Sequence, residues 1–413
     1  MRQNVFDTLK ERGFLAQTSD EATIRRWLGE EQITFYIGYD CTATSLHVGH
    51  LVPIMSMMHL QRAGHRPVAL VGGGTTMVGD PSGRTEMRQL ITEDTIRGYA
   101  QRIHAQLNHY LNFEEGQAIN VNNADWLLDL NYIDFLREIG RHFSVNRMLT
   151  AEAYKQRLER GLSFIEFNYQ LLQAYDFLHL FRTYNCTMQM GGDDQWSNLL
   201  AGADLIRRVE GQEAQVMTYP LLTTSSGAKM GKTAAGAVWL DAELLSPYDF
   251  YQYWINCDDR DVEKLLKIFT FLPLDEIARL GALQGAEIRQ AKRVLAFEAT
   301  RITHGQEAAQ EAQAAAEAAF RSGAGADASG LPTTRIPLNR LRQGLRVVDV
   351  FAEVGLARSR NEARRLLKQG GVYVNDRRVQ DAEGFLTESD IAGDGIMLRA
   401  GKKKYHFLAI TGS

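Results

Sequence analysis

Residues 33–72, ITFYIGYDCTATSLHVGHLVPIMSMMHLQRAGHRPVALVG, decide the fold. The stretch begins with a β-branched and aromatic run at 33–39 and ends with a short apolar run at 66–72, and both are typical of strands. Between them lies a helical segment that Gly64 stops. Proline is tolerated in the first turn of a helix and is costly further in, so the helix that holds Pro53 should begin at about Val48 or Gly49. A strand, a helix and a strand in this order predict a parallel right-handed crossover.

Outward from this unit, strand-like and helix-like segments continue to alternate. Strands are predicted at 118–122, 187–191 and 215–222, and helices at 94–111, 164–181 and 195–209. The fold class is therefore α/β: a Rossmann-like open parallel sheet that binds ligands beyond the carboxyl ends of its strands. An α-helical domain and a small α+β domain should follow it.

The domain boundaries come from changes in composition. Residues 307–320 form an Ala-rich helical run and 322–332 are rich in small residues, as in a linker. The predicted parts are 1–222 for the sheet domain, 223–245 for a loop and connection, 246–321 for the helical domain, 322–337 for the linker and 338–413 for the C-terminal domain.

Composition excludes several classes of protein. The 413 residues include three widely spaced cysteines, which suggest neither a disulfide framework nor a zinc site. No apolar run approaches the length of a membrane helix, and the charged N-terminal stretch is unlike a signal peptide. We therefore expect a cytoplasmic protein with no membrane contact. The net charge of −4 argues against a general polyanion binder, but 358–378 and 402–404 are basic and indicate a directed anionic partner.

Three polar segments could bind phosphate. His47 and His50 flank the predicted helix start, where unpaired N–H groups favour an anion. Lys229 and Lys232 lie in a Gly, Ser and Thr-rich loop, and the Asp-Pro-Ser-Gly turn precedes a basic stretch containing residues 84 and 88. Other interpretations stay open at this point. One histidine could cap the helix while the other is exposed, the pair could hold a metal, and both loops could be ordinary surface loops.

The segments together resemble a known family. HVGH and KMGKT are similar to the two signatures of class I aminoacyl-tRNA synthetases, and they occur in the same order. YIGYDCTATSLHVGH, NYQLLQAYDF and QMGGDDQWSN resemble the tyrosyl-tRNA synthetases. RSRNEARRLLKQGGVYVNDRRV resembles an S4-type RNA-binding domain. The resemblance covers the chain nearly end to end, although Ile37, Cys41 and Gly231 depart from residues common in the family.

The resemblance implies a role for individual residues. The substrate phenol would be bound by Tyr36 and Asp176, and the substrate ammonium by Asp80, Tyr169 and Gln173. Spacing alone places Tyr169, Gln173 and Asp176 on one helix face. The full set implied for tyrosine is Tyr36, Asp80, Tyr169, Gln173, Asp176 and Gln195.

Further sets are implied for ATP, catalysis and RNA. ATP would be bound by Gly38, Asp40, Thr42, His47, Gly49, His50, Gly192, Asp194 and Lys232. Catalysis on the phosphates would use Thr42, His47, His50, Arg84, Arg88, Lys229, Lys232 and Thr233. RNA would be bound by Arg358, Arg360, Arg364, Arg365, Lys368, Arg377 and Arg378.

The implied activity is tyrosine–tRNA ligation. ATP and L-tyrosine would give tyrosyl-adenylate and pyrophosphate, and the tyrosyl group would then move to the terminal ribose of tRNA(Tyr). Mg²⁺ would arrive with ATP and no resident metal is expected. The 246–321 domain would bind the anticodon, and the family implies a homodimer. Three alternatives are a small adenylyltransferase, a tryptophanyl-tRNA synthetase and a catalytically dead relative that binds RNA.

Overall fold

The computed structural model describes residues 4–82, 91–151, 154–155, 158, 161–225, 227, 229–233, 236–321, 331–401 and 404–411. These residues form two compact units. The first unit comprises 1–241 and 258–291, and the second comprises 242–257 and 292–413. No helix in the described part of the chain is both long and apolar enough to cross a membrane.

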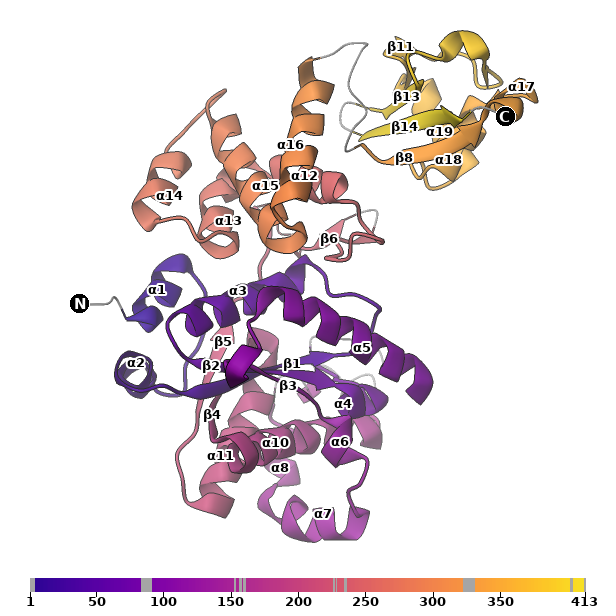
Figure 1. Ribbon diagram of the computed structural model, residues 1–413. Coiled ribbons are helices and arrows are strands. Elements are labelled where there is room, and N and C mark those ends of the chain that lie inside the picture. The colour runs from indigo at the N-terminus through magenta and orange to yellow at the C-terminus, as the bar shows by residue number, and fades with distance from the viewer. Residues whose placement is uncertain are drawn as a thin grey trace. The chain divides into compact units, whose positions relative to one another are not determined.

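A five-stranded parallel sheet is the centre of the first unit (Figure 1). Its order is β3-β2-β1-β4-β5, so the strand that carries the opening sequence is central. The strands are β1 Thr34–Asp40, β2 Arg66–Gly72, β3 Ile119–Asn122, β4 Cys186–Gly192 and β5 Gln215–Tyr219. All five predicted strands are confirmed. The last one is shorter than the predicted 215–222, because Pro220 cannot donate to a strand ladder.

Helices cover both faces of this sheet (Figure 1). α3, Val48–Arg62, and α5, Glu93–Tyr110, pack on one face, while α10, Phe164–Tyr184, and α11, Trp196–Glu210, pack on the other. The sequence fixes the ends of α10 with local hydrogen bonds. Ser163 and Glu166 form a reciprocal capping box at its start, and Asn185 ends it in the left-handed conformation with φ 52°.

Shorter helices complete the first unit. Around the sheet are α1 Val5–Arg12, α2 Glu21–Glu30, α4 Gly73–Val78, α6 Ala124–Leu127, α7 Tyr132–Glu138 and α8 Val145–Met148. α13, Val262–Phe269, and α14, Leu274–Gly281, also belong to this unit. Both lie inside the segment predicted as a separate helical domain.

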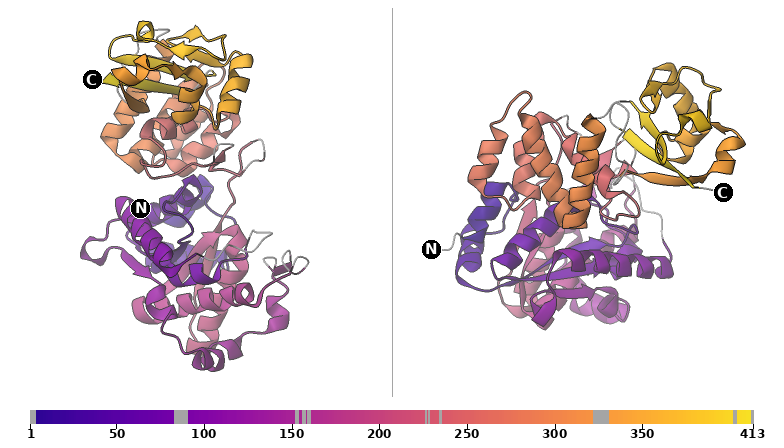
Figure 2. Two further views of the ribbon diagram at one scale, coloured as in Figure 1. Left: turned by 90° about the vertical axis from the view of Figure 1, so that its right-hand side faces the viewer. Right: turned by 45° about the horizontal axis from the view of Figure 1, so that its top comes forward.

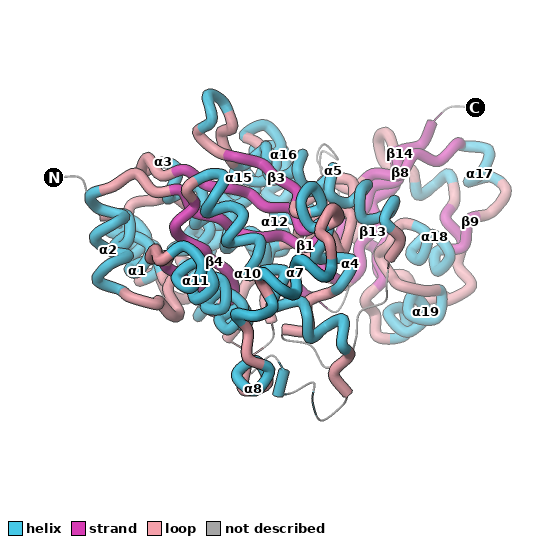
Figure 3. The backbone as a smooth tube through the Cα atoms, turned by 90° about the horizontal axis from the view of Figure 1, so that it is seen from below, coloured by secondary structure: helices cyan, strands magenta, loops and turns pink. Residues whose placement is uncertain are grey.

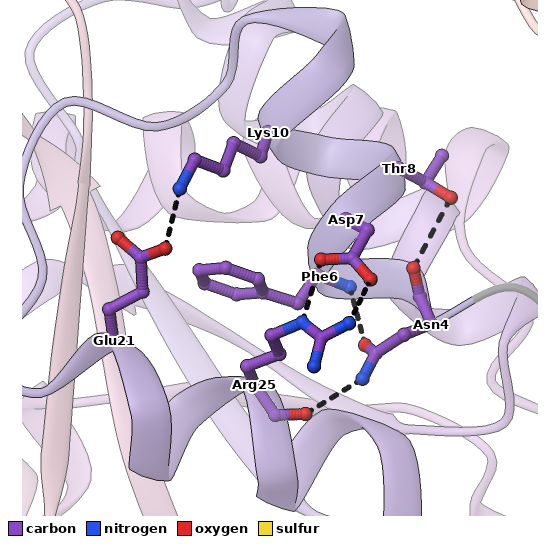
Figure 4. A network of polar contacts seen from close by, with 7 residues as sticks. All are labelled: Asn4, Phe6, Asp7, Thr8, Lys10, Glu21 and Arg25. Carbon is purple, nitrogen blue, oxygen red and sulfur yellow. Dashed lines mark hydrogen bonds and ion pairs between the residues drawn. The ribbon is translucent and has the colours of Figure 1, made fainter.

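The N-terminal helices are held by polar contacts. The Arg25 guanidinium donates two hydrogen bonds to the Asp7 carboxylate, at 2.8 and 2.7 Å, and Asn4 caps α1 while donating to the Arg25 carbonyl (Figure 4). At the other end of α1, the buried Arg12 guanidinium donates to the backbone carbonyls of three residues at and after the end of α13: Lys267, Thr270 and Leu272. Helix C-termini have unpaired carbonyls, which a cation can satisfy.

The second unit combines helices with a second sheet. Its helices are α12 Pro247–Ile255, most of α15 Ile288–His304, and α16 Gln306–Arg321. The sheet, yellow and light orange in Figure 2, has the order β11-β10-β13-β14-β8. Its strands are β8 Thr333–Pro337, β10 Val372–Val374, β11 Arg377–Arg378, β13 Gly395–Ala400 and β14 Lys404–Thr411.

Helices α17, Leu338–Arg342, α18, Val347–Glu353, and α19, Arg360–Lys368, belong to this C-terminal part (Figure 3). Apolar residues of α18 and α19 share a buried cluster with residues of β10, β13 and β14. Strand β8 was not expected, because it lies within 322–337, the predicted linker. It pairs in parallel with β14 at the edge of the sheet.

Candidate active site

A cavity of about 970 Å³ lies in the first unit, where the first sheet strand ends. Its lining comes from β1, β4 and β5, from the start of α3, from α10 and from the segment after β5. Most residues that the sequence predicts for tyrosine, ATP and catalysis line this one cavity: Tyr36, Gly38, Asp40, Thr42, His47, Gly49, His50, Asp80, Tyr169, Gln173, Asp176, Gly192, Asp194, Gln195 and Lys229.

A buried carboxylate, that of Asp176, lines the cavity. Its side chain is 2% exposed and accepts hydrogen bonds from Asn123 Nδ2 at 2.9 Å and from Trp126 Nε1 at 2.8 Å. Burial raises the pKa of Asp176 to about 7, the two hydrogen bonds oppose this rise, and the charge of Asp40 adds to it. Asp176 is therefore an acceptor that a ligand donor would stabilise in its ionised form.

A second buried carboxylate belongs to Asp80. It accepts a hydrogen bond from Gln195 Nε2 at 2.6 Å and from the Ser82 backbone N–H at 2.9 Å. Burial, with the charge of Asp40, raises the pKa of Asp80 to about 6. Asp40 itself accepts from Thr75 Oγ1 at 3.0 Å and from the Tyr169 hydroxyl at 3.3 Å. Three carboxyl groups in one cavity favour a cationic ligand.

Some uncharged polar groups in the cavity wall lack hydrogen-bond partners among the described residues. The Tyr36 hydroxyl and Gln173 Oε1 are buried and make no hydrogen bond within the described part of the chain. Tyr36 is 1% exposed, and burial together with Asp176 raises the pKa of its hydroxyl well above the usual value. Buried polar groups are nearly always paired in native proteins, so these two indicate that a ligand supplies the missing partners.

The two histidines of HVGH both cap α3. The backbone N–H of Gly49 donates to His47 Nδ1 at 3.0 Å, and the backbone N–H of His47 donates to His50 Nδ1 at 3.1 Å. This reciprocal box excludes the alternative in which one histidine caps the helix and the other is only exposed, because both side chains take part in capping. A neutral imidazole that accepts at Nδ1 carries its proton on Nε2. Each ring can therefore also donate to an anion.

The second signature lies against the first. Residues 238–240 run antiparallel to 46–48, with Val48 N–H donating to the Val238 carbonyl and Leu240 N–H to the Leu46 carbonyl, both at 2.9 Å. A short hairpin precedes them, formed by β6, Lys232–Thr233, and β7, Gly236–Ala237. These contacts bring two of the three predicted phosphate-binding segments together at the start of α3. For Lys232 and Thr233 of β6, the structure describes the backbone only. The exposed side chain of Lys229 lines the cavity.

Gly231 has a structural reason to be glycine in this conformation. Its φ is 81°, and a Cβ atom placed there would lie 3.0 Å from the Gly49 backbone nitrogen. Any other residue would be strained both by the backbone conformation and by the contact. This departure from the family pattern therefore lets the loop approach the start of α3 closely.

The remaining predicted residues lie elsewhere. Arg84 and Arg88 are outside the described residues. The predicted RNA-binding side chains lie before and on α19 and on β11. Several are paired with acids, namely Arg360 with Asp349, Arg365 with Glu362 and Arg377 with Asp390. In each of these pairs the arginine side chain is exposed, while its acidic partner is partly buried.

Sequence reasoning missed two residues that bind Asp176. Asn123 follows the end of β3, and Trp126 lies on α6. The available signal was the position of NNADW directly after a predicted strand, where α/β sheets place ligand-binding residues. Asn123 is fully buried and also donates to Thr75 Oγ1 at 3.0 Å. It therefore ties the Asp176 carboxylate to the segment after β2.

Comparisons with known proteins agree with this geometry. Residues 29–321 match the family model of class I tRNA synthetases (W and Y), and residues 326–408 match that of the tyrosine–tRNA ligase SYY-like C-terminal domain. The tyrosine–tRNA ligase of Clostridium botulinum (strain 657 / Type Ba4) is 58% identical, covering 98% of this chain and 99% of that protein. The tyrosine–tRNA ligase of Caldanaerobacter subterraneus subsp. tengcongensis is 54% identical, with the same coverage.

A solved structure is also similar. The C-terminally truncated mitochondrial tyrosyl-tRNA synthetase of Aspergillus nidulans aligns with a TM-score of 0.69 and 30% identity, covering 76% of this chain and 93% of that one. Two family models match, the identity extends over nearly the full length, and the fold is shared. The chain therefore belongs to the class I tRNA synthetases, among the tyrosine–tRNA ligases.

Proposed function

We propose that the chain uses this cavity to activate L-tyrosine with ATP and then transfers the tyrosyl group to the 3′-terminal ribose of tRNA(Tyr). The observation that carries the proposal is the pairing of two groups at one end of the cavity. The buried Asp176 carboxylate is an acceptor, and the Tyr36 hydroxyl has no partner within the described residues. A phenol can donate to the first and accept from the second. An indole N–H can donate but offers no comparable oxygen to accept, which favours tyrosine over tryptophan.

The ammonium group of tyrosine would bind at the second carboxylate. Asp80 supplies the charge, Gln173 Oε1 supplies an acceptor without a present partner, and the Tyr169 hydroxyl is a further acceptor. Gln195 holds the Asp80 carboxylate through its amide nitrogen. The ammonium has three donors to place, and these three oxygens can take them. We assign Gln195 to the carboxylate side of the substrate as well.

The adenosine and phosphates of ATP would occupy the rest of the cavity. Asp194 and Gly192 follow β4 and would bind the ribose, together with Asp40 and Gly38 at the end of β1. The phosphates would lie at the start of α3, where Gly49 leaves backbone space and the histidines present Nε2–H groups. The full phosphate set is Thr42, His47, His50, Lys229, Lys232 and Thr233, with Arg84 and Arg88 from the segment that precedes α5.

The first chemical step needs no protein nucleophile. A tyrosine carboxylate oxygen attacks the α-phosphorus of ATP in line, the bond from that phosphorus to the bridging oxygen breaks, and pyrophosphate leaves. In the second step a ribose hydroxyl of tRNA attacks the tyrosyl carbonyl, and AMP leaves with the bonding pair. The protein would supply positioning and donors aimed at the charge that develops on the phosphates.

Magnesium would enter with ATP and neutralise part of the phosphate charge. Within the described ranges, no group of three or more His, Cys, Asp and Glu side chains is placed to hold a metal ion.

The parts of the chain would divide this work. We keep 1–222 as the tyrosine and ATP domain, 223–245 as the signature loop and connection, and 246–321 as the anticodon-binding domain. Because β8 pairs with β14, we shorten the predicted linker from 322–337 to 322–332 and begin the S4-type RNA-binding domain at 333 rather than 338. The predicted RNA-binding arginines and Lys368 would contact phosphates of tRNA(Tyr). We place the enzyme in the cytoplasm, where its substrates are made.

We also propose a homodimer. Large apolar side chains are exposed together around α6, α7, α8 and the start of α10, and a second copy would cover them: Leu128, Tyr132, Ile133, Leu136, Val145, Phe164 and Ile165. Light scattering should give twice the chain mass for wild type and a lower mass for Ile133→Asp. Leu244→Asp, at an exposed leucine elsewhere, should remain dimeric. A wild-type protein of single-chain mass would refute the dimer.

An exchange assay tests the main proposal. Pyrophosphate label should enter ATP when L-tyrosine is added and should not do so with the other nineteen standard amino acids. Exchange with tryptophan instead would reassign the substrate. No exchange with any amino acid would identify a protein that retains the family fold without its activation chemistry.

A further inference from the structure

Gln189 is a buried amide on β4 that no part of the sequence reasoning had singled out. It is 2% exposed, lines the cavity, and pairs in parallel register with Tyr36 of β1. Adjacent strands are about 4.8 Å apart, so the two side chains are neighbours on one face of the sheet. Both lie beside Phe177, whose ring is 5.3 Å from the ring of Tyr36.

The amide of Gln189 has an unsatisfied oxygen. Oε1 makes no hydrogen bond among the described residues, as is true of the Tyr36 hydroxyl. α11 closes this side, because a Cβ added at Gly202 would lie 3.4 Å from Gln189 Oε1 and 2.9 Å from Phe177 Cδ1. The Gln189 side chain therefore has Phe177 and α11 on one side, and it lines the same cavity as Tyr36. An unpaired buried amide costs stability, so a function must compensate for it.

A second buried glutamine on the next strand shows the ordinary arrangement. Gln215 of β5 is 3% exposed, its Oε1 accepts from Ser19 Oγ, and its Nε2 donates to Glu213 Oε1 at 2.6 Å. Both ends of that amide are satisfied within the protein. The two glutamines thus form a matched pair in one sheet, one with structural partners and one without.

We propose that Gln189 is a specificity-determining positioning residue that acts through Tyr36. The inference rests on the proposed function. Neither the Tyr36 hydroxyl nor Gln189 Oε1 has a partner among the described residues, so the two groups are not hydrogen-bonded to each other in the empty protein. A change of the Gln189 side-chain torsions on tyrosine binding would bring Nε2 to the Tyr36 hydroxyl oxygen, since rotation about the terminal bond exchanges the amide oxygen and nitrogen. With tyrosine bound, Gln189 Nε2–H donates to Tyr36, the Tyr36 O–H donates to the substrate phenol, and the phenol O–H donates to Asp176.

This chain of hydrogen bonds can run in only one direction, from Gln189 to Asp176. Each hydroxyl has a single proton, so a donor at Gln189 leaves Tyr36 to point its own proton at the substrate. Asp176 ends the chain as an acceptor, because its two present partners both donate to it. Phenylalanine would interrupt the chain in the middle and leave the Tyr36 hydroxyl and Asp176 without the partner that tyrosine supplies. Gln189 would therefore add to the rejection of phenylalanine without touching the substrate.

The test is a double-mutant cycle read by substrate selectivity. The kcat/KM for tyrosine and for phenylalanine is measured by pyrophosphate exchange in wild type, Gln189→Met, Tyr36→Phe and the double variant. Methionine keeps the length of glutamine and removes its donor and acceptor. Gln189→Met should lower the tyrosine-to-phenylalanine ratio ~10-fold, the cost of one neutral hydrogen bond. In the Tyr36→Phe background the same change should lower the ratio by less than ~2-fold, because the group it acts through is gone.

Stability measurements separate this role from a structural one. Gln189→Met removes no hydrogen bond of the empty protein, so its Tm should not fall, whereas Gln215→Met breaks two and should lower the Tm while keeping the selectivity ratio. If Gln189→Met does not fold, Gln189→Glu serves instead, since its carboxylate can only accept and should lower the ratio. An unchanged ratio, or losses that multiply in the double variant, would overturn the proposal. Wild type that fails to activate tyrosine would refute the proposed function instead.

Discussion

At the scale of single residues, the cavity contains two buried carboxyl groups whose ionised forms are unfavourable without a ligand. Burial raises the pKa of Asp176 to about 7 and that of Asp80 to about 6. A carboxyl group whose pKa is higher in the folded than in the unfolded protein contributes to the stability of the empty protein. The full contribution is present below the carboxyl pKa of the unfolded chain, which is about 4. That contribution is lost as the pH rises through about 6 and about 7. The ammonium and phenol of tyrosine are donors, so binding favours the ionised carboxylates.

Tyrosine binding should therefore be linked to proton release. At about pH 6 both carboxyls are partly protonated in the empty cavity, and binding should release about one proton in total. At about pH 8.5 it should release almost none. Calorimetry in buffers of different ionisation enthalpy measures this number directly. A proton count that does not depend on pH would show that neither carboxyl meets the ligand.

The tryptophan beside Asp176 provides a second check of the same charge. The Trp126 N–H lowers the pKa of this carboxyl, so Trp126→Phe should raise that pKa and move the binding midpoint to higher pH. Trp27→Phe, on α2 and away from the cavity, is the matched control and should leave the midpoint in place. A midpoint that moves to lower pH in Trp126→Phe would contradict the assignment.

The residue-scale predictions had a clear limit. The spacing of Tyr169, Gln173 and Asp176 on one helix was sufficient to place all three on one cavity wall. Asn123 and Trp126 were missed because their partner, Asp176, is about 50 residues away, and no local pattern records such a contact. Hydrogen-bond partners of buried charges are set by the tertiary fold.

At the scale of elements, long strands and helices were predictable and short edges were not. The five parallel strands carry apolar residues either in a run, as in β2, or in alternation with polar ones, as in β3. The segment at residues 16–19 shows neither pattern, yet it joins the sheet edge antiparallel to β5, with Ala16 N–H donating to the Thr218 carbonyl and Thr218 N–H to the Gln17 carbonyl, both at 2.8 Å. An edge this short has no periodicity to detect. Strand β8 escaped prediction because only one of its five residues, Ile336, is buried, so its sequence shows no apolar pattern.

This edge segment should help to position the ribose-binding turn. Gln17 Nε2 and Thr218 Oγ1 both donate to Asp193 Oδ1, at 2.7 and 2.8 Å, directly before Asp194. Gln17→Glu cannot donate when ionised and repels Asp193, so the KM for ATP should rise ~3 to 10-fold with a smaller change in kcat. Asp193→Asn keeps an oxygen acceptor and should stay near wild type. Gln32→Glu, an exposed glutamine that donates to the Gly64 carbonyl, is the control. An unchanged KM in Gln17→Glu would show that the edge is only structural.

The signature hairpin should act on the transition state. Lys232→Ala should slow adenylate formation by ~10²-fold or more, because its charge would stabilise the departing pyrophosphate, while the Kd of tyrosine should stay nearly constant. Lys10→Ala, on α1, should change neither quantity. Stopped-flow fluorescence follows the step. An unaltered rate in Lys232→Ala would remove the hairpin from the catalytic account.

At the scale of the whole molecule, the C-terminal part should be needed for tRNA and dispensable for activation. Every residue assigned to tyrosine or ATP precedes residue 240. Because β8 already belongs to the C-terminal sheet, the cut should follow α16, removing residues 322–413. The shortened protein should keep pyrophosphate exchange near the full-length rate and lose most tRNA charging. Full-length charging should weaken as salt rises. Equal charging by both proteins would show that the basic part does not bind tRNA.

The family and its activity could be anticipated from short motifs because the chemistry restricts them to a few places on the sheet. The association of α13 and α14 with the first unit could not, since it depends on contacts such as that of Arg12 with carbonyls about 255 residues away. Composition marks where a chain changes character, but packing decides which elements form a unit.

The central claim is that a buried pair, Tyr36 and Asp176, selects a phenol. The most direct measurement is the ratio of kcat/KM for tyrosine over phenylalanine in wild type and in Tyr36→Phe. Wild type should give ~10⁴ to 10⁵, a magnitude taken from tyrosyl-tRNA synthetases as a class, and Tyr36→Phe should reduce it ~10-fold, because one neutral hydrogen bond is lost while the charged acceptor remains. A ratio in Tyr36→Phe equal to that of wild type would mean that Tyr36 does not contact the phenol, and the assignment of the pocket would be wrong.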